Sequence, residues 1–471
     1  MNLIFVSAEV APYSKAGGLA DVAGSLPGAL SPIMDTTQVL TPLYGQIDLD
    51  KYGIQPTSIS GEVVLGDDTI PYTLFQIIDP DTELRVGFIE CEQFFGRDGI
   101  YTEDNGEGFS DNNRRYFFFQ LAVFDLLSRG EFKTDVLHCN DHHTGLLPLM
   151  VKHSSLTLKT IYTIHNFLYH GHFSDHDCAL LPPSILDSLS ITQWDNYSAL
   201  LEGIEHSDIV TTVSPGYARE LIEGINVDAH SHKVIIKALP KLSGIVNGID
   251  TEYWSPEKDG FTPHHFSHND ISGKLKNKVE LLKQCGLDND PDMPLIGSIS
   301  RLVENKGFPL IVELLDDFVA LGAKFVFLGS GDPRIAKQLK AARDKHPGKI
   351  AFDDGFNEPL AHLIEAGCDM FLMPSRFEPC GLNQLYSLRY GTIPIVHKTG
   401  GLGDTVLPWK SDSGTGFVFD TYDSDSLRII LEKALKVYGN KIDWQRLMTR
   451  AMLQDFSWDR SAEQYFELYK N

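Results

Sequence analysis

The sequence predicts an α/β protein built from two doubly wound halves, each with a mostly parallel sheet. Short apolar runs alternate with helical patterns through most of the chain, which is typical of βαβ units. The 471 residues exceed the size at which one hydrophobic core keeps growing. A hydrophobic fraction of 42%, with 10% aromatic residues, supplies enough apolar material for two complete cores.

In the first half, each predicted strand is an apolar run too short for a helix. These runs are Leu3–Ser7, Gln38–Thr41, Val136–Cys139, Thr160–Ile164 and Ile209–Val213. Two further runs, Tyr72–Ile78 and Leu84–Glu90, are separated by the turn-forming residues 79–83. That spacing predicts a β-hairpin added to the parallel sheet. A last strand-like run, Ser243–Val246, ends this half.

The second half repeats the alternation of strand and helix. Its predicted strands are Leu295–Ser300, Phe325–Leu328, Ile350–Asp353, Met370–Met373, Ile393–His397 and Gly416–Phe419. Helical patterns follow them, for example over Leu310–Leu321, Arg334–Lys345 and Ser426–Tyr438. Each half therefore reads as its own doubly wound sheet.

The predicted boundary divides the chain into domains 1–246 and 247–471. The turn-forming stretch 247–250 follows the last strand of the first half, and Phe261–Asp270 reads as a connecting loop. The final helical segment, Ala462–Asn471, is compatible with packing on either half. Open α/β sheets bind ligands at the carboxyl ends of their strands, so we expect the ligand in the cleft between the halves.

Composition excludes several classes of partner. A formal net charge of -24 leaves no basic excess for binding a nucleic acid through its phosphates. No apolar run approaches the length of a membrane span, so we expect no membrane partner.

The six cysteines are scattered without a Cys-x-x-Cys pair, and the start reads as a buried strand rather than a signal peptide. We therefore expect a cytoplasmic protein.

Each of two glycine pairs lies between a predicted strand and the helical segment that follows it. They lie in the similar segments Lys15-Ala16-Gly17-Gly18-Leu19 and Lys398-Thr399-Gly400-Gly401-Leu402. Glycine lets backbone N–H groups approach an anion, and a helix N-terminus adds a partial positive charge. A plain tight turn explains an isolated pair better; with Lys15 and Lys398 beside the pairs, a turn and a phosphate or sugar contact are equally favoured. Neither segment matches Gly-x-Gly-x-x-Gly or a P-loop, which disfavours dinucleotide enzymes and P-loop NTPases.

In the second half, charged residues follow two predicted strands. Arg301 and Lys306 come after the first strand, where two cations can neutralise a leaving diphosphate; taken alone, they read as ordinary charges of a solvated loop. Glu378 and Pro379 follow Met370–Met373 and open a helix. The Glu378 carboxylate there can accept hydrogen bonds from sugar hydroxyls, or simply favour the helix start. Cys380 has no accompanying His/Asp pattern and reads as a packed small residue.

In the first half, polar residues end two neighbouring strands. Asp141 follows Val136–Cys139, and His165 follows Thr160–Ile164, so we expect both side chains at one edge of the sheet. Further histidines nearby, among them His142 and His170, raise zinc binding as an alternative. Their spacing is irregular and no carboxylate–histidine helix motif accompanies them, which disfavours a metal site.

Eight motifs in order make the chain similar to bacterial glycogen synthases and plant starch synthases. They are Lys15-x-Gly17-Gly18-Leu19, Asp111-Asn112-x-x-Arg115-Tyr116, Asp141-x-His143, His165-Asn166, Asn247-Gly248-Ile249-Asp250, Ser300-Arg301-Leu302-x-x-x-Lys306-Gly307, Arg376-Phe377-Glu378-Pro379-Cys380-Gly381-Leu382 and Thr399-Gly400-Gly401-Leu402. One such motif is weak, but eight in family order across nearly the whole chain are specific. The resemblance implies the GT-B fold, with two Rossmann-like domains. It also implies a retaining, metal-independent glucosyltransferase that uses ADP-glucose or, less often, UDP-glucose, with an α-glucan as the acceptor and no cofactor.

The resemblance also implies roles for individual residues. Its catalytic set is Lys15, Asp141, His165, Arg301, Lys306 and Glu378. Its donor-binding set is Lys15, Gly17, Gly18, Asn247, Arg301, Lys306, Phe356, Glu378, Cys380, Gly381, Leu382, Thr399, Gly400 and Gly401. Three of these are cations that would hold the diphosphate, while Glu378 and His165 would bind glucose hydroxyls. Phe356 stands where the family usually has Tyr and would stack on the nucleobase.

Two departures and two alternatives accompany this interpretation. His142 replaces a Trp common in the family, and Tyr386 stands where many related retaining enzymes carry a second Glu. A glucan-binding scaffold without turnover would share the fold, as would a transferase that prefers UDP-glucose. The sequence leaves the donor base, the chain-length preference and the oligomeric state open. A processed plastid protein would also resemble this chain, with the stroma as its location.

Overall fold

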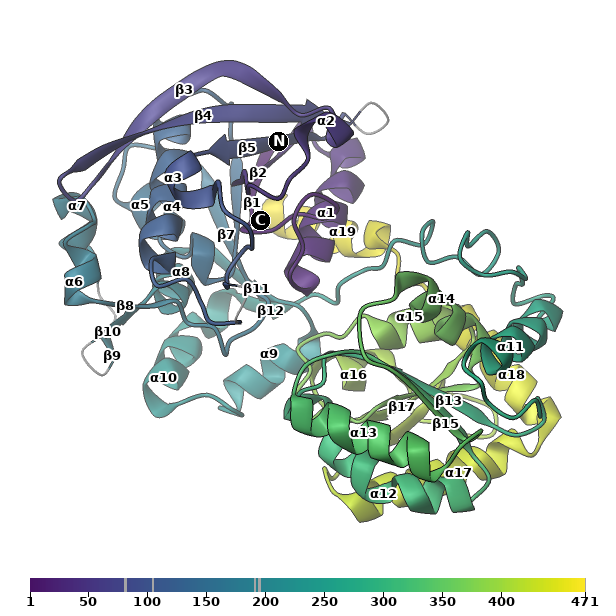
Figure 1. The fold of residues 1–471 in the computed structure, drawn as a ribbon. Helices are drawn as coiled ribbons and strands as arrows, with labels where there is room; N and C mark the ends of the chain where they lie inside the picture. The colour runs from purple at the N-terminus through teal and green to yellow at the C-terminus, as the bar shows by residue number, and fades with distance from the viewer. Residues whose placement is uncertain (80–82, 104–105, 190–191, 194–195, 471) are drawn as a thin grey trace. The chain divides into compact units, whose positions relative to one another are not determined.

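The computed structural model describes residues 1–79, 83–103, 106–189, 192–193 and 196–470 (Figure 1). The chain forms two compact units. Unit 1 comprises Met1–Gly248 together with the segment that begins at Trp458, and unit 2 comprises Ile249–Ser457. The final helix therefore belongs to unit 1, which decides between the two packings that the sequence left open. Asn247, placed by the sequence at the start of the second domain, lies at the end of unit 1.

Within the described residues, unit 1 has a nine-stranded sheet in the order β12-β11-β7-β6-β1-β2-β5-β4-β3. Its strands are β1 (Asn2–Val6), β2 (Thr36–Pro42), β3 (Gln55–Leu65), β4 (Asp68–Ile78), β5 (Arg85–Glu90), β6 (Val136–Asn140), β7 (Lys159–Ile164), β11 (Ile209–Thr212) and β12 (Leu242–Gly244). All neighbours pair in parallel except β4, which runs antiparallel to β3 and β5. The predicted hairpin is confirmed as the β4–β5 pair, although residues 80–82 of its turn lie outside the described residues.

A separate small sheet and a set of α-helices complete unit 1. The small sheet has the order β8-β10-β9 and consists of β8 (His172–Ser174), β9 (Thr192–Gln193) and β10 (Asn196–Ser198). The helices are α1 (Gly18–Leu30), α2 (Leu49–Tyr52), α3 (Glu92–Phe95), α4 (Asn112–Ser128), α5 (Leu147–Lys152), α6 (Asp175–Cys178), α7 (Pro183–Leu186), α8 (Ala199–His206), α9 (Pro215–Ile222), α10 (Ala229–Ala238) and α19 (Trp458–Lys470), with the 3-10 turns η1 (Ser31–Ile33), η2 (His142–Thr144) and η3 (Leu239–Lys241).

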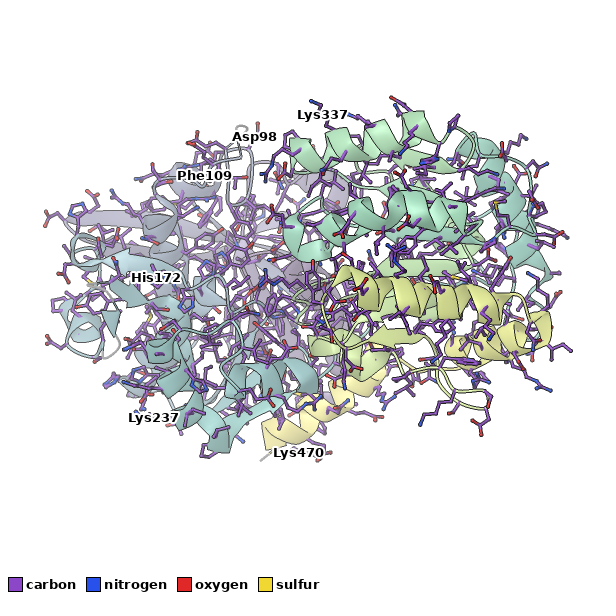
Figure 2. The ribbon with its side chains drawn as sticks, turned by 90° about the horizontal axis from the view of Figure 1, so that it is seen from below. Asp98, Phe109, His172, Lys237, Lys337 and Lys470 are labelled. Carbon is purple, nitrogen blue, oxygen red and sulfur yellow. The ribbon has the colours of Figure 1, made fainter. Side chains whose placement is uncertain are left out.

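Amphipathic patterning fixes which face of each helix is buried. On α10, Val234 and Ile235 pack inward, while Lys237 lies on the solvent side (Figure 2). The strand β1 is buried on both faces, which explains why Leu3–Val6 reads as a continuous apolar run in the sequence. Within the described residues, no helix combines the length and apolar character needed to cross a bilayer.

The C-terminal helix is held in unit 1 by buried polar contacts. In Figure 1, α19 in yellow lies against α1 in purple. The His138 ring on β6 hydrogen-bonds through Nδ1 to the Tyr469 hydroxyl at 2.7 Å. The Ser461 hydroxyl donates to the carbonyl of Val246 at 2.7 Å. These contacts fasten the end of the chain to β6, which precedes Asp141, and to the segment that follows β12.

Unit 2 has a six-stranded parallel sheet in the order β15-β14-β13-β16-β17-β18. Its strands are β13 (Leu295–Ile299), β14 (Lys324–Leu328), β15 (Ile350–Asp353), β16 (Met370–Met373), β17 (Ile393–His397) and β18 (Phe417–Phe419). Its helices are α11 (Ser272–Gln284), α12 (Phe308–Ala320), α13 (Pro333–Lys345), α14 (Glu358–Gly367), α15 (Asn383–Arg389), α16 (Gly400–Thr405), α17 (Ser424–Tyr438) and α18 (Lys441–Met452), with the 3-10 turn η4 (Glu304–Lys306). Two doubly wound sheets confirm the predicted fold class.

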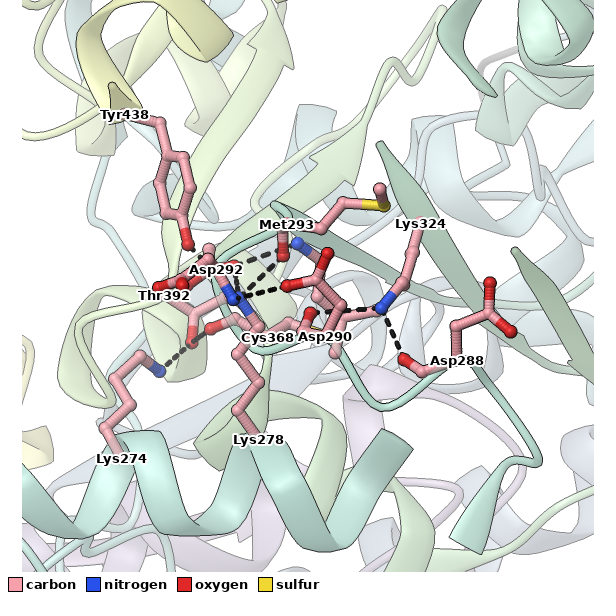
Figure 3. A network of polar contacts seen from close by, with 12 residues as sticks. Lys274, Lys278, Asp288, Asp290, Asp292, Met293, Lys324, Cys368, Thr392 and Tyr438 are labelled. Atoms are coloured by element: carbon pink, nitrogen blue, oxygen red, sulfur yellow. Dashed lines mark hydrogen bonds and ion pairs between the residues drawn. The ribbon is translucent and has the colours of Figure 1, made fainter. Parts of the chain in front are cut away.

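Buried lysines on α11 fasten this helix to the sheet of unit 2 (Figure 3). Lys274 donates to the Thr392 hydroxyl at 2.6 Å, and burial lowers the pKa of Lys274 to about 8. Lys278 donates to the Asp369 carboxylate at 2.6 Å and to the Tyr438 hydroxyl at 3.1 Å. Because buried ammonium groups are costly without partners, the position of α11 is closely fixed.

Each sheet has a point where the strand order reverses. In unit 1 it lies between β1 and β6, and in unit 2 between β13 and β16. Loops leaving the carboxyl ends of such a strand pair diverge and leave room for a ligand. In unit 1 these loops carry Lys15 and Asp141. In unit 2 they carry Lys306 and Glu378. These four predicted catalytic residues therefore lie on the loops beside the two switch points.

Candidate active site

In unit 1, the loop between β1 and α1, residues 7–17, presents Lys15 and Gly17. The Lys15 side chain is 55% exposed and pairs with Asp21 at 2.6 Å. Gly17 caps α1 in an extended conformation and Gly18 is the first helical residue. The Gly17 amide donates to the buried carboxylate of Glu9 at 2.9 Å. Glu9 therefore already satisfies one of the amides that the glycine pair was expected to offer to a ligand.

Asp141 leaves the end of β6 in a strained backbone conformation. Its φ is 54° and its ψ is -179°, a combination that non-glycine residues rarely adopt. The carboxylate accepts the His165 amide at 2.7 Å and the Asn166 amide at 3.4 Å. These bonds join the ends of β6 and β7, which brings Asp141 and His165 together.

Burial dominates the electrostatics of Asp141. It raises the pKa of the Asp141 carboxyl to about 7, against the lowering effect of the two amides that it accepts, and the charge of Glu9 raises it slightly further. The Asp141 carboxyl therefore keeps its proton to a higher pH than an exposed aspartate does. Functional carboxylates are commonly found with such displaced pKa values.

The hydrogen bonds around His165 fix its tautomer. Asn140 donates through its side-chain amide to the carbonyl of Val6 at 3.0 Å, so its oxygen faces His165 Nε2 at 2.9 Å. A carbonyl oxygen only accepts, so Nε2 carries the proton and Nδ1 keeps a lone pair. Burial lowers the pKa of His165 to about 3, which keeps the ring neutral. His165 is therefore built to accept a hydrogen bond from a hydroxyl group through Nδ1.

The neighbouring histidines are packed against one another. The rings of His142 and His143 lie 3.7 Å apart, and those of His170 and His172 stack at 4.9 Å. Burial lowers the pKa of His142 to about 4. Across the described part of the chain, no group of three or more His, Cys, Asp or Glu side chains is arranged to hold a metal ion.

Asn247 lies beyond β12 with its side chain buried. It is 7% exposed, and within the described residues its carbonyl oxygen Oδ1 has no hydrogen-bond partner. An unsatisfied buried acceptor is costly unless a ligand or water satisfies it. Asn247 thus offers an acceptor of the kind that a sugar hydroxyl requires.

In unit 2, the centre of the site is the contact between Lys306 and Glu378. The Lys306 ammonium lies 2.5 Å from Glu378 Oε2, which also accepts the Ser375 hydroxyl at 3.1 Å. Glu378 is 7% exposed. Gly307 makes this contact possible, because a Cβ at its φ of 83° would meet the carbonyl of Pro374 at 2.1 Å. The two loops that leave β13 and β16 are therefore in direct backbone contact.

The second glycine pair supports the Glu378 loop, residues 374–382, from behind. Gly400 has a φ of 42°, and a Cβ there would meet the carbonyl of Glu378 at 2.1 Å. The Gly401 amide donates to that same carbonyl at 3.2 Å. Thr399 caps α16 and is buried. In this structure, the two glycines therefore allow the start of α16 to pack closely against the backbone of Glu378.

The other predicted donor residues of unit 2 lie on the segments that follow β13, β15 and β16. Cys380 is 4% exposed, Gly381 has a φ of 75°, and Leu382 caps α15. Arg301 is exposed on the loop after β13. Phe356 follows β15 with its ring 88% exposed, and the described contacts do not join it to the Lys306–Glu378 pair. So large an exposed aromatic ring is unusual and suits a stacking partner.

Comparisons with known proteins identify the family. The starch synthase catalytic domain model matches residues 2–233, and the glycosyl transferases group 1 model matches residues 284–444. A glycogen synthase from Anaeromyxobacter sp. (strain Fw109-5) is 40% identical over 484 residues, covering 100% of this chain and 99% of the relative. The chain belongs to the glycogen and starch synthase family. As a member of this family, it is a glycosyltransferase.

Further relatives support the family assignment. Glycogen synthase 2 from Geobacter sulfurreducens is 37% identical over 485 residues, covering 100% of this chain and 98% of the relative. The catalytic domain of starch synthase IV from Arabidopsis thaliana, bound to ADP and acarbose, matches with a TM-score of 0.90 and 32% identity, covering 100% of this chain and 98% of that one. A sucrose-phosphate synthase from Thermosynechococcus elongatus, at 15% identity and a TM-score of 0.60 over 100% of this chain and 98% of that chain, shows only the shared fold. The fold is GT-B.

Proposed function

We propose that this enzyme transfers glucose from ADP-glucose to the non-reducing end of an α-1,4-glucan, with retention of configuration and without a metal ion. The observation that carries the proposal is the pairing of Lys306 with Glu378 at 2.5 Å, on the loops that flank the switch point of unit 2. A cation and a buried carboxylate at this place match a sugar diphosphate, which presents both negative charge and hydroxyl groups.

The cations stabilise the departing diphosphate. Lys15, Arg301 and Lys306 supply positive charge there, as a metal ion does in other transferases. Lys15 and Lys306 are each held by a carboxylate in this structure, Asp21 and Glu378 respectively. Phosphate oxygens then replace or join those carboxylates when the donor binds. The bound ADP in the Arabidopsis relative supports an adenine nucleotide as the leaving group.

Each unit, taken by itself, carries side chains that can hydrogen-bond to sugar hydroxyls. Glu378 accepts from sugar hydroxyls through its carboxylate, and His165 accepts through Nδ1. Asn247 offers its unpartnered carbonyl oxygen. Phe356 stacks on the adenine ring, a contact for which its exposed ring is suited. Asp141 lies next to the acceptor hydroxyl.

The chemical step exchanges one bond at the anomeric carbon for another on the same face. The bond from C1 to the diphosphate oxygen breaks, and the acceptor's 4-hydroxyl oxygen bonds to C1. The hydroxyl proton passes to the leaving phosphate oxygen, so the products are ADP and a glucan one residue longer. The protein contributes positive charge and position rather than a nucleophile. The bacterial relatives favour the bacterial cytoplasm over a plastid as its location.

Variants at the central pair test this proposal. Lys306→Ala and Glu378→Ala should each lower the rate of glucose transfer from ADP-glucose at least about 100-fold, because each removes charge stabilisation or sugar binding. Both variants should keep the far-UV circular dichroism of the wild type. Lys436→Ala, on the exposed face of α17, is the matched control and should transfer glucose at the wild-type rate. Near-normal turnover in either central variant would remove the assignment.

A further inference from the structure

The carboxylate of Glu9 is buried where the backbone amides of the Lys15 loop converge. Its side chain is 3% exposed. Oε2 accepts the Ala16 amide at 2.5 Å and the Gly17 amide at 2.9 Å, and Oε1 accepts the Tyr101 hydroxyl at 3.0 Å. One carboxylate thus takes three hydrogen bonds from two separate segments of unit 1.

The Glu9 carboxylate occupies the place where the backbone amides of the loop could otherwise bind an anionic ligand. Two successive amides at the start of α1 point at a single oxygen atom, as they would toward a phosphate. In this structure the amides of Ala16 and Gly17 are thus already hydrogen-bonded to Glu9. The Lys15 side chain, 55% exposed, is what the loop presents to the diphosphate. The direction of Lys15 is set by the backbone that Glu9 holds.

Burial of the Glu9 carboxylate costs free energy, because a charged group is removed from water. It raises the pKa of the Glu9 carboxyl, although the hydrogen bonds from Ala16, Gly17 and Tyr101 act in the opposite direction. An apolar residue would avoid this cost but would leave the Ala16 and Gly17 amides unpartnered. The three donors partly offset this cost, and the carboxylate in turn leaves neither amide unpartnered.

Glu9 also connects the Lys15 loop to the loop that carries Asp141. The ring of Tyr101, which donates to Glu9, stacks on the ring of His143 with centroids 4.8 Å apart. His143 lies two residues after Asp141, in the turn η2. The two loops that flank the switch point of unit 1 are thus joined through a single buried acid.

We propose that Glu9 is a positioning residue for the glucosyltransferase reaction: it holds the backbone of residues 16–17 so that Lys15 reaches the diphosphate. Its catalytic consequence rests on the proposed function, whereas the backbone clamp itself does not. Glu9 touches no substrate and acts through Lys15. Removing its carboxylate should therefore matter only as long as Lys15 is present to be positioned.

A double-mutant cycle tests this dependence. Glu9→Gln keeps an oxygen acceptor and the side-chain volume, and it should lower kcat/KM for ADP-glucose about tenfold; Glu9→Ala, which leaves the amides unpartnered, should lower it about 100-fold, the scale of a 1 Å misplacement. In a Lys15→Ala background, Glu9→Gln should change kcat/KM by less than about twofold. An equal loss with and without Lys15 would overturn the proposal. Glu365→Gln alters a buried carboxyl of unit 2 and is the control for a purely structural loss.

Hydrogen exchange separates this inference from the proposed function. The amides of residues 16–17 should exchange slowly in the wild type, at least about tenfold faster in Glu9→Ala, and at an intermediate rate in Glu9→Gln. This holds whether or not the protein uses ADP-glucose. Unchanged protection in Glu9→Ala would refute the clamp. If the clamp is seen but the wild type transfers no glucose from ADP-glucose, the proposed function fails and the positioning role fails with it.

Discussion

Replacing Asp141 by Asn should stabilise the protein at alkaline pH while impairing catalysis. Asp141 keeps a proton in the folded state up to a pKa of about 7, mainly because of burial, whereas the carboxyl of the unfolded chain titrates near 3.8. Between these values the unfolded chain has lost the proton that the folded chain retains. The free energy of unfolding therefore falls as the pH rises through this range, and the penalty is complete above about pH 7.

The size of the penalty follows from the displacement of the pKa. At about 1.4 kcal/mol per pH unit, it is about 2 kcal/mol at pH 5.5 and about 4 kcal/mol at pH 8.5. The asparagine side chain of the variant carries no charge to bury, and its carbonyl oxygen can still accept the His165 amide at the place where Asp141 does. The stability gain of Asp141→Asn should thus be about 2 kcal/mol larger at pH 8.5 than at pH 5.5.

Urea unfolding of the wild type and of Asp141→Asn at these two pH values measures the difference directly. Initial rates of transfer from ADP-glucose, measured in parallel, should be lower in Asp141→Asn because a carboxylate beside the acceptor is lost. Asp208→Asn, which removes a partly buried carboxylate bonded to Thr160, is a control for general charge effects. A stability difference that is equal at both pH values, or that favours the wild type more at pH 8.5, would refute the argument.

Three further substitutions test separate parts of the structure. Phe356→Ala should raise the KM for ADP-glucose about tenfold through lost stacking on the base, with an unchanged melting temperature because the ring is 88% exposed. Gly248→Ala should cost about 1–3 kcal/mol in thermal unfolding, because its Cβ would lie 2.6 Å from the Cα of Trp458 and push α19 away. Gly400→Ala should lower glucose transfer at least about tenfold, because its Cβ would collide with the carbonyl of Glu378 and move that side chain.

Two control variants accompany these substitutions, and each prediction has a result that would contradict it. Gly28→Ala, inside α1 with no atom within 4 Å of the added Cβ, should be neutral or slightly stabilising. Leu453→Ala removes another exposed apolar side chain and should leave the KM unchanged. An unaltered KM in Phe356→Ala would remove its stacking role. Wild-type stability in Gly248→Ala, or wild-type activity in Gly400→Ala, would show that the close backbone contacts are not required.

The buried strands were the most predictable part of the fold. Met370–Met373 and Ile393–His397 are buried along their whole length, so their apolar runs coincide with β16 and β17 to the residue. The edge strand β3 was missed, because in Gln55–Leu65 exposed and partly buried residues alternate and few are apolar. The final helix was predicted, but its packing on unit 1 depends on buried contacts such as that of Tyr469 with His138. Sequence patterns do not encode such long-range pairs.

The candidate site was predictable where family motifs mark charged residues that follow a strand. Lys306 and Glu378 were selected by those motifs, because position alone left Lys306 as a surface charge, and the structure joins the two side chains. Glu9 was missed because a single acid in a loop has no pattern of its own. Gly401 was expected to face a ligand, yet its amide donates to the carbonyl of Glu378. Hydrogen-bond partners within loops depend on three-dimensional closure, which spacing does not specify.

The most direct test of the central claim is the transfer of radiolabelled glucose into precipitable glycogen, from ADP-glucose and in parallel from UDP-glucose, with a chelator present throughout. The account predicts rapid incorporation from ADP-glucose that the chelator does not reduce. Incorporation from UDP-glucose alone would contradict the proposed donor, and loss of activity with chelator would contradict the metal-free mechanism. Binding of glucan with no incorporation from either donor would contradict the account as a whole and favour a scaffold that has lost turnover.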